Sequence, residues 1–264
     1  MRVAVAGKGG AGKTTLSASL ARLASRSGIA VVAIDADSNP NLMAALGIER
    51  DRAGTASALA PSIVSRRLGG PALSEPLEAV LDHFAVTGPD GVRVALMGMP
   101  AHADQGCLCG AHATVSAVLD DLGSHPELLT IVDLEASPEH LSRGTARHVD
   151  TLLLVTEPYY RSLETVRRLA SLAAELPIPR VAVVANKVRS PTDSEAVSEF
   201  CARHSLEFGA AIPWSDEVVQ ADLEGVPAID RAEGVVDAIS TMAERLLQVE
   251  LPRMATQPAA SPLG

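Results

Sequence analysis

The sequence contains few aromatic residues, few cysteines and no long hydrophobic run, and each shortage excludes a class of protein. Aromatic side chains make up 2% of the 264 residues, too few for a base-stacking platform on single-stranded nucleic acid. Three cysteines are too few for a disulfide scaffold and suit a reducing compartment. Apolar runs such as residues 152–155 are far shorter than a membrane span. Because residues 1–6 lead directly into a glycine loop and leave no room for a signal peptide, we expect a cytoplasmic protein.

Positive charge is also scarce, since the formal net charge is −10. An acidic chain lacks the broad basic surface that binds DNA or anionic lipid, so we expect neither nucleic acid nor a membrane as a partner. The hydrophobic fraction of 47% and the charged fraction of 20% are those of a globular protein. A chain of this length buries a core large enough to fold without disulfides or a structural metal.

Short apolar runs alternate with helical segments along the chain. The runs are continuously apolar, as expected for strands whose two faces are both covered. We therefore expect an α/β fold with a doubly wound, mostly parallel sheet and helices on both faces. The expected strands are residues 2–6, 31–35, 92–97, 129–133, 151–156, 180–185 and 206–212, and the expected helices are residues 13–27, 39–46, 114–122, 138–148, 162–175, 193–204, 216–224 and 235–247.

The pattern predicts one domain over residues 1–250, because no linker or internal repeat interrupts it. Within this domain, residues 49–90 contain several prolines and glycines and are expected to form an irregular, mobile helical excursion. Residues 101–112 form a loop that carries two cysteines. Residues 251–264, with three prolines among small residues, are expected to be a disordered tail.

The loop after the first expected strand is rich in glycine and predicts a phosphate site. Its glycine spacing fits both a dinucleotide fingerprint, with Asp35 as the ribose-binding acid, and a P-loop. Lys13 and Thr14 decide between them, because a P-loop uses the lysine on the β- and γ-phosphates and the hydroxyl on magnesium. A dinucleotide loop has no role for that cation. The residues predicted to bind the nucleotide here are Gly9, Gly10, Ala11, Gly12, Lys13, Thr14 and Thr15.

The run Lys8 to Thr15 resembles the deviant Walker A motif of the MinD/ParA class of ATPases, to which the nitrogenase iron protein also belongs. The resemblance implies a homodimer in which Lys8 reaches the partner's nucleotide, so that Lys8 and Lys13 are both catalytic. It also implies that Asp37 positions the attacking water and that Asp35 lies on the metal side. Asp37 also fits a simple helix cap. Asp133 follows an apolar run, as an acid that binds magnesium through water should.

Asn186 and Lys187 follow the sixth expected strand and predict the purine site. Proteins specific for GTP place an aspartate two residues after this lysine, whereas Arg189 stands there and can only donate hydrogen bonds. ATP is therefore the expected nucleotide, with Mg²⁺. The turn Ile212, Pro213 and Trp214 is expected to close over the adenine, although Trp214 also fits plain packing.

Cys107 and Cys109 are separated by one residue. In an extended segment both sulfurs share a face, and a two-fold dimer supplies four thiolates, which suits a tetrahedral metal site. The alternative is a pair of small buried cysteines in a turn. His102 and His112 fit either extra ligands or surface residues, and Cys201 is expected to pack in a helix.

Beyond these motifs, residues 1–225 resemble the CooC-type accessory ATPases that assist nickel insertion into carbon monoxide dehydrogenase. The stretch 139–146, Glu-His-Leu-Ser-Arg-Gly-Thr-Ala, discriminates best between these and other MinD/ParA proteins. The resemblance implies that Cys107 and Cys109 hold nickel or zinc between subunits and that ATP turnover switches the dimer for a client metalloenzyme. Ser137 departs from the family, which commonly has glycine there, and residues 49–90 match poorly.

Three other functions compete with this interpretation. A positioning or regulatory ATPase of the MinD/ParA type without a metal role would leave the two cysteines idle. An iron–sulfur dimer would need a cluster cysteine in residues 133–143, and this stretch contains none. A nicotinamide-dependent oxidoreductase is disfavoured by Lys13 and Thr14.

Overall fold

The structure, a computed structural model, describes residues 1–67, 70–98 and 108–248. A nine-stranded sheet runs through it. Eight of its strands, among them β3 (Ala58–Leu59), lie in the order β11-β10-β9-β1-β8-β2-β7-β3, and all of these neighbours pair in parallel. The ninth strand, β6 (Val86–Thr87), pairs with β7 in antiparallel orientation. All seven expected strands are present, and the mostly parallel sheet is confirmed. They are β1 (Arg2–Gly7), β2 (Ala30–Ala36), β7 (Arg93–Met97), β8 (Leu128–Leu134), β9 (Thr151–Thr156), β10 (Arg180–Val188) and β11 (Glu207–Pro213).

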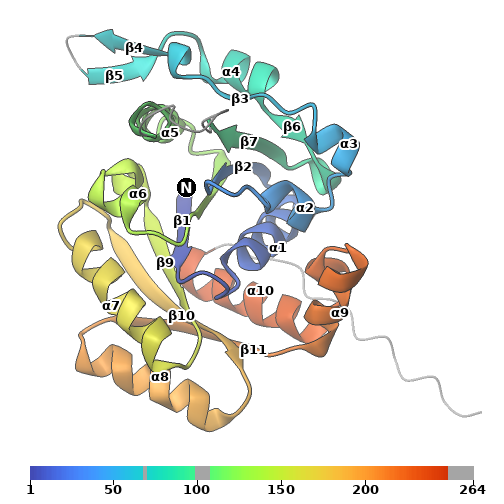
Figure 1. Cartoon of the computed structure of the whole chain (residues 1–264), viewed down its shortest axis with the longest axis vertical. Helices are drawn as coiled ribbons and strands as arrows, with labels where there is room; N and C mark the ends of the chain where they lie inside the picture. The colour runs from blue at the N-terminus through green and yellow to red at the C-terminus, as the bar shows by residue number, and fades with distance from the viewer. Residues whose placement is uncertain (68–69, 99–107, 249–264) are drawn as a thin grey trace, which may run out of the picture.

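Helices cover both faces of this sheet (Figure 1), so the doubly wound arrangement is confirmed. Successive residues of β1 face opposite cores: Val3 and Val5 pack on one side, Ala4 and Ala6 on the other. This is why the strands read as continuously apolar. One core is shared with α1 (Lys13–Arg26), α2 (Leu42–Leu46) and α10 (Glu233–Leu247), and the other with α4 (Leu77–Phe84), α5 (Cys109–Leu122), α7 (Tyr160–Ala173) and α8 (Pro191–Arg203).

Residues 49–90 differ from the expected helical excursion, because they also contain strands. The helices α3 (Arg50–Ala53) and α4 are accompanied by β3 (Ala58–Leu59) and β6 (Val86–Thr87), which pair with β7. A separate antiparallel hairpin, β4 (Val64–Arg67) and β5 (Gly70–Leu73), projects from the same region (Figure 1). These strands are too short to show a period, and their pairing partners set their conformation, which explains why the sequence did not predict them.

Two helix boundaries also differ from expectation. The single helix expected over residues 138–148 is split into α6 (Glu139–Ser142) and a 3₁₀ turn (Thr145–His148) by Gly144, whose φ is +69°. Helix α5 begins at Cys109 and not at residue 114, so the second cysteine of the pair belongs to a helix. Both differences lie beside the predicted metal loop.

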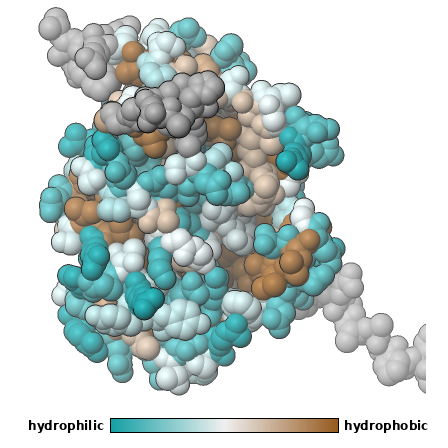
Figure 2. All heavy atoms as spheres, viewed as in Figure 1, coloured by the Kyte–Doolittle hydropathy of each residue, from teal (hydrophilic) through white to brown (hydrophobic). Residues whose placement is uncertain are grey.

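The visible surface is largely hydrophilic, with an apolar patch over α9 (Asp216–Glu224), where Val219 and Leu223 are exposed (Figure 2). Among the residues that the structure describes, no helix is both long enough and apolar enough to cross a membrane.

Candidate nucleotide site and cysteine loop

The loop between β1 and α1 has the backbone geometry of a phosphate cradle. Gly10 and Gly12 adopt φ values of +82° and +94°, a region that residues with a Cβ avoid. The amide of Ala11 donates to the carbonyl oxygen of Lys8 at 3.1 Å and closes the turn. No side chain caps the start of α1, so its first backbone N–H groups stay available to an anion.

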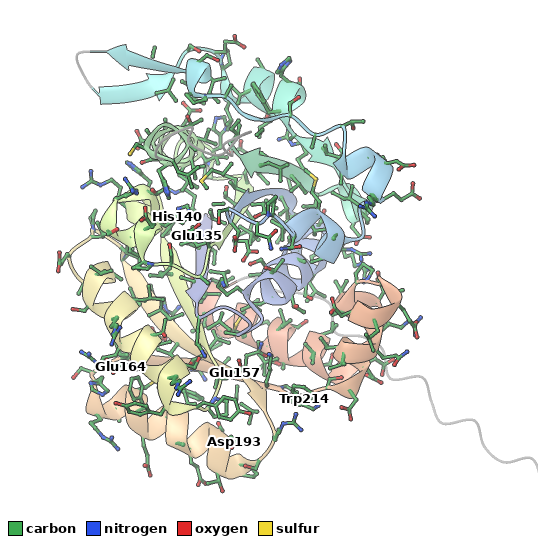
Figure 3. The ribbon with its side chains drawn as sticks, in the orientation of Figure 1. Glu135, His140, Glu157, Glu164, Asp193 and Trp214 are labelled. Atoms are coloured by element: carbon green, nitrogen blue, oxygen red, sulfur yellow. The ribbon has the colours of Figure 1, made fainter. Side chains whose placement is uncertain are left out.

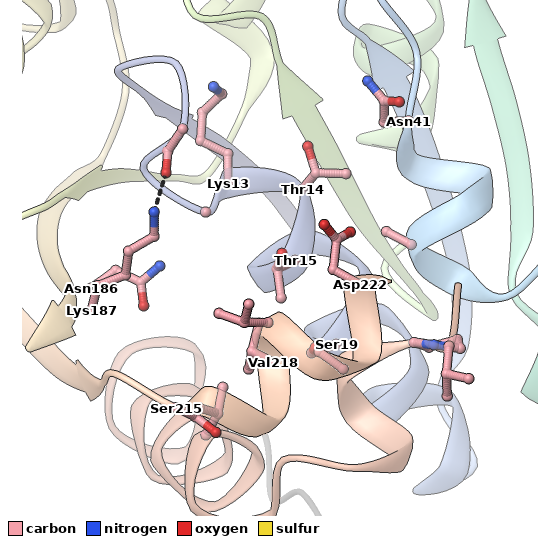
Figure 4. Close-up of a pocket in the computed structure, with 18 of the residues that line it drawn as sticks. Lys13, Thr14, Thr15, Ser19, Asn41, Asn186, Lys187, Ser215, Val218 and Asp222 are labelled. Atoms are coloured by element: carbon pink, nitrogen blue, oxygen red, sulfur yellow. Dashed lines mark hydrogen bonds between the residues drawn. The ribbon is translucent and has the colours of Figure 1, made fainter. Parts of the chain in front are cut away.

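A cavity of about 610 Å³ opens beside this loop, between α1, the end of β10 and α9 (Figure 4). Nine of the residues predicted to bind nucleotide line it: Gly10, Gly12, Lys13, Thr14, Thr15, Asn186, Lys187, Pro213 and Trp214. Three predicted residues do not. Ala11 is fully buried, Ile212 is 2% exposed within the core, and Gly9 lies on the outer side of the loop near Ala136. The predicted role of these three residues in nucleotide binding stays a prediction.

Asn186 and Lys187 hold the phosphate loop from the neighbouring strand end. Asn186 Nδ2 donates to Ala11 O at 2.7 Å, and Lys187 Nζ donates to Gly10 O at 2.6 Å. A Cβ at Gly12 would overlap Asn186 Nδ2, so this glycine is needed for close approach as well as for its positive φ. The predicted contact of Asn186 with the base stays a prediction, but its bracing of the loop is an additional role that the sequence did not suggest.

Trp214 and Arg189 lie together at the rim of the cavity. The Arg189 guanidinium carbon lies 3.8 Å from the centroid of the Trp214 ring, and Trp214 Nε1 donates to Asp216 Oδ1 at 3.0 Å. Arg189 stands where GTP-specific proteins have an acceptor for guanine N–H groups, and a guanidinium only donates. Arg189 therefore offers no acceptor for the N–H groups of guanine, and the preference for adenine stays a prediction.

Two buried carboxylates meet behind the loop. Asp133 on β8 lies opposite Asp35 on β2 in the sheet register, and each is 1% exposed. Asp133 accepts hydrogen bonds from Ser17 Oγ at 3.1 Å and from the side chain of Thr14. Burial, together with the charge of Asp35, raises the pKa of Asp133 to about 7. A hydroxyl and a carboxylate in contact form a hard-oxygen donor set that fits Mg²⁺, which would neutralise the charge that burial disfavours.

Both carboxylate oxygens of Asp35 already accept hydrogen bonds from backbone amides. Its Oδ1 accepts from the Asp37 amide at 3.1 Å and its Oδ2 from the Leu42 amide at 2.8 Å. Burial also raises the pKa of this carboxyl. Asp35 thus fixes the loop that carries Asp37, and its predicted role in binding magnesium stays a prediction.

The two other predicted catalytic groups, Lys8 and Asp37, lie nearer the surface. The Lys8 side chain is exposed, and within residues 1–67, 70–98 and 108–248 its ammonium has no ion pair. Asp37 is half-buried and accepts from the Asn39 amide at 2.8 Å. It does not cap α2, whose N-cap is Asn41. Burial lowers the pKa of Lys13, an effect opposed by the nearby carboxylates of Asp133, Asp37 and Glu135.

The predicted metal loop is described only in part, since Cys107 and His102 lie outside the described residues. Cys109 is exposed at the first position of α5, and Arg143 Nη1 donates to its sulfur at 3.2 Å. The extended-segment argument for the two cysteines is wrong for Cys109, because this residue is helical. In the described part of the chain, no group of three His, Cys, Asp or Glu residues could hold a metal ion.

His112 corrects a further expectation, since it is not a surface residue. It is 3% exposed, and its ring centroid lies 4.4 Å from that of His140. Burial lowers the pKa of both histidines, that of His140 to about 4. Cys201 packs in the core as expected, and burial raises the pKa of its thiol to about 11.

The similarity of the chain to known proteins agrees with the geometry of the nucleotide site. A family model described as the CobQ/CobB/MinD/ParA nucleotide binding domain matches residues 3–228. The chain belongs to this family. It is a P-loop ATPase, and the MinD/ParA resemblance of its first loop is confirmed. The carbon monoxide dehydrogenase accessory protein CooC of Rhodospirillum rubrum is 33% identical over 260 residues, which cover 94% of this chain and 97% of the relative.

Other known proteins resemble the chain in sequence or in fold. An uncharacterized ATP-binding protein of Methanocaldococcus jannaschii is 30% identical over 236 residues, covering 86% of this chain and 90% of the relative. The MinD cell division protein of Aquifex aeolicus superposes with a TM-score of 0.70 at 21% identity, covering 97% of this chain and 100% of that chain. A ParA family ATPase from Chlorobium tepidum also gives 0.70 at 21% identity, with coverages of 93% and 99%.

Two parts of the site of this MinD/ParA-family ATPase were missed by sequence reasoning. Ser17 binds Asp133 from the turn of α1 that follows Lys13, and its i+4 spacing from Lys13 was a usable signal. Val218 and Asp222 of α9 form the wall of the cavity opposite the phosphate loop (Figure 4). Nothing in their local sequence distinguishes them from other helix residues.

Proposed function

We propose that this ATPase works as a homodimeric metal-handling factor that assists nickel insertion into a client metalloenzyme such as carbon monoxide dehydrogenase. In this proposal Cys107 and Cys109 of both subunits bind nickel or zinc as cargo between them. ATP binding and hydrolysis switch the dimer between holding the metal and releasing it. Magnesium, when bound beside Thr14 and Asp133, supplies positive charge to the phosphates.

The observation that carries the proposal is the position of Cys109. This cysteine is exposed at the start of α5 and contacts Arg143, which follows α6, the helix that begins five residues after β8 and its Asp133. A metal ligand placed there lies beside the segment that responds to nucleotide in a P-loop ATPase. The similarity to CooC also supports the metal-handling proposal, since it extends over the cysteine loop as well as the nucleotide site.

The roles of the nucleotide residues follow from charge and position. Lys13, buried at the start of α1, places its ammonium on the β- and γ-phosphates. Lys8 is exposed and available to reach the nucleotide of a second subunit, which would make hydrolysis depend on dimerisation. Asp37 is placed on the loop after β2 to orient the attacking water.

The test is metal analysis of the purified, reduced protein with and without ATP, beside the double variant Cys107→Ser, Cys109→Ser. We expect the wild-type dimer to bind stoichiometric nickel or zinc and the double variant to lose it while keeping its ATP affinity. Cys201→Ser is the matched control, since this thiol lies in the core, and it should leave metal content unchanged. Equal metal content in the wild type and the double variant would refute the proposal.

The alternative is a MinD/ParA-like positioning or regulatory ATPase without a metal role. It predicts ATP-dependent capture of the protein by anionic lipid vesicles or by non-specific DNA. We expect neither, because the net charge is −10 and a polyanion would be repelled.

A further inference from the structure

A continuous series of contacts joins the end of β8 to the start of α5. Ser137 Oγ donates to Glu135 Oε1 and accepts from the Glu139 amide at 3.2 Å. Glu139 pairs with Arg143, and Arg143 Nη1 donates to Cys109 Sγ at 3.2 Å. The series therefore begins two residues after the buried acid Asp133 and ends on a proposed metal ligand.

A second series starts at the end of β2 and reaches the same turn of α5. His140 Nε2 donates to the carbonyl oxygen of Ala36 at 2.7 Å, between Asp35 and Asp37. The His140 ring packs against His112, which lies three residues after Cys109 on α5, and His112 Nδ1 lies 3.0 Å from Thr145 Oγ1. Figure 3 shows His140 and Glu135 side by side at the inner edge of α6. Both strand ends that carry the acids of the nucleotide site thus contact α6.

The segment that joins the two series has the features of a movable element. Helix α6 spans only Glu139–Ser142, follows Pro138 and is ended by Gly144 in a left-handed conformation. His112 Nε2 and His140 Nδ1 are buried without a hydrogen-bond partner. An unpaired buried polar atom is costly, so these two nitrogens lower the stability of the present arrangement relative to one that would pair them.

We propose that His112, His140 and Arg143 are positioning residues through which ATP occupancy sets the placement of Cys109. When the ends of β2 and β8 adjust to the triphosphate, His140 and Glu139 move with them, and α6 carries the change to the first turn of α5. The inference rests on the proposed function for its purpose, since it gives the ATP cycle a means to alter a metal ligand. A role in packing alone predicts that substitutions lower stability and leave the nucleotide effect on Cys109 unchanged.

The test measures the rate at which Cys109 reacts with iodoacetamide, with no nickel or zinc present. The starting chain carries Cys107→Ser and Cys201→Ser, so that Cys109 is the one remaining cysteine, and it is reduced before use. The rate is measured without nucleotide, with MgADP and with a magnesium-bound, non-hydrolysable ATP analogue. ATP affinity and the thermal midpoint are measured for every variant, so that full occupancy and folding are established.

We expect the ATP analogue to change the rate by about fivefold or more, the lower end of measured couplings between sites. His140→Leu and Arg143→Ala should reduce this change to less than about twofold, since each removes one contact series. His140→Gln keeps an N–H group for Ala36 O and should retain part of the effect. Arg147→Ala, an exposed arginine four residues after Arg143, is the matched control and should behave as the starting chain does.

Two results would overturn the inference: a rate in the starting chain that does not depend on nucleotide, or a nucleotide effect that persists in both His140→Leu and Arg143→Ala at full occupancy. These results are separable from the metal proposal. If the wild type binds no metal but the reactivity pattern holds, the coupling stands and the metal cargo is wrong. If metal binds but the reactivity pattern fails, the metal proposal stands and the coupling is wrong.

Discussion

Helices α1 and α5 both follow a parallel strand, and each spans 14 residues, yet their first turns are set in place very differently. Helix α1 starts after residues 8–12, a loop held by its own glycine conformations and by bonds from β10. Its first residue, Lys13, is 7% exposed. Helix α5 starts after residues 98–108, and its first residue, Cys109, is exposed and contacts an arginine 34 positions later.

The difference between the two helix starts shows two ways in which a sequence can determine the position of a functional residue. The phosphate site is specified by a short motif, because each glycine, the lysine and the hydroxyl act within one turn of the chain. Cys109 contacts Arg143, the residue that follows α6, and under the coupling proposed above its placement changes when α6 moves. A fixed site for the nucleotide and an adjustable site for a thiol are what an ATP-driven switch requires.

The largest effect should come from a residue of the fixed loop that acts on another subunit. We expect Lys8→Ala to lower the hydrolysis rate of the dimer by about 100-fold or more, since positive groups supplied in trans to a transferring phosphoryl group contribute about 10³–10⁵-fold. Steady-state ATPase assays over a dilution series check this. Wild-type activity per subunit that stays flat through the dimer dissociation range would contradict it.

Within a single subunit, Lys13→Ala should weaken ATP binding by about 30-fold. The loss corresponds to about 2 kcal/mol for a charge-assisted contact whose phosphate partner stays behind unpaired. Isothermal titration calorimetry on dilute protein measures this affinity. Lys8→Ala is the matched control, because an exposed lysine that acts across the dimer should leave the affinity of a single subunit unchanged. Equal affinities of Lys13→Ala and the wild type would contradict the phosphate assignment.

A smaller effect is expected in the pH dependence of stability, to which Asp133 and His140 contribute in opposite directions. Burial raises the pKa of Asp133 from 3.8 to about 7, so the folded chain binds a proton that the unfolded chain releases. This contribution makes the unliganded protein less stable as pH rises from about 4 to about 7. Burial lowers the pKa of His140 from 6.5 to about 4, so its contribution makes the protein more stable as pH rises through nearly the same window.

The two trends oppose each other, and Asp133→Asn should separate them. In this variant the free energy of unfolding should increase with pH between about 4 and 6.5, and at pH 8 it should exceed the wild-type value by on the order of 2–4 kcal/mol. His140→Gln should show the opposite slope. Urea unfolding of the nucleotide-free proteins at several pH values measures both. A profile of Asp133→Asn that runs parallel to the wild type would contradict the assignment of a strongly raised pKa.

The sequence predicted the sheet and the nucleotide site well because both depend on local patterns. The strand runs are buried on both faces, and five residues of the predicted phosphate loop line the cavity: Gly10, Gly12, Lys13, Thr14 and Thr15. The short strands β3 and β6 were missed, since their conformation depends on pairing with β7. His112 was misjudged for a similar reason: it is buried and packs against His140, a residue 28 positions away.

The bond from Asn186 to the carbonyl oxygen of Ala11 has a consequence for redesign. Strand β9 lies between β1 and β10, so this amide reaches across a strand to support the loop of another. Replacing Asn186 would therefore also remove a bond that supports the phosphate loop. A variant that accepts a different base while keeping its affinity would have to be made at Arg189 or Trp214, where no bond to the phosphate loop is at stake.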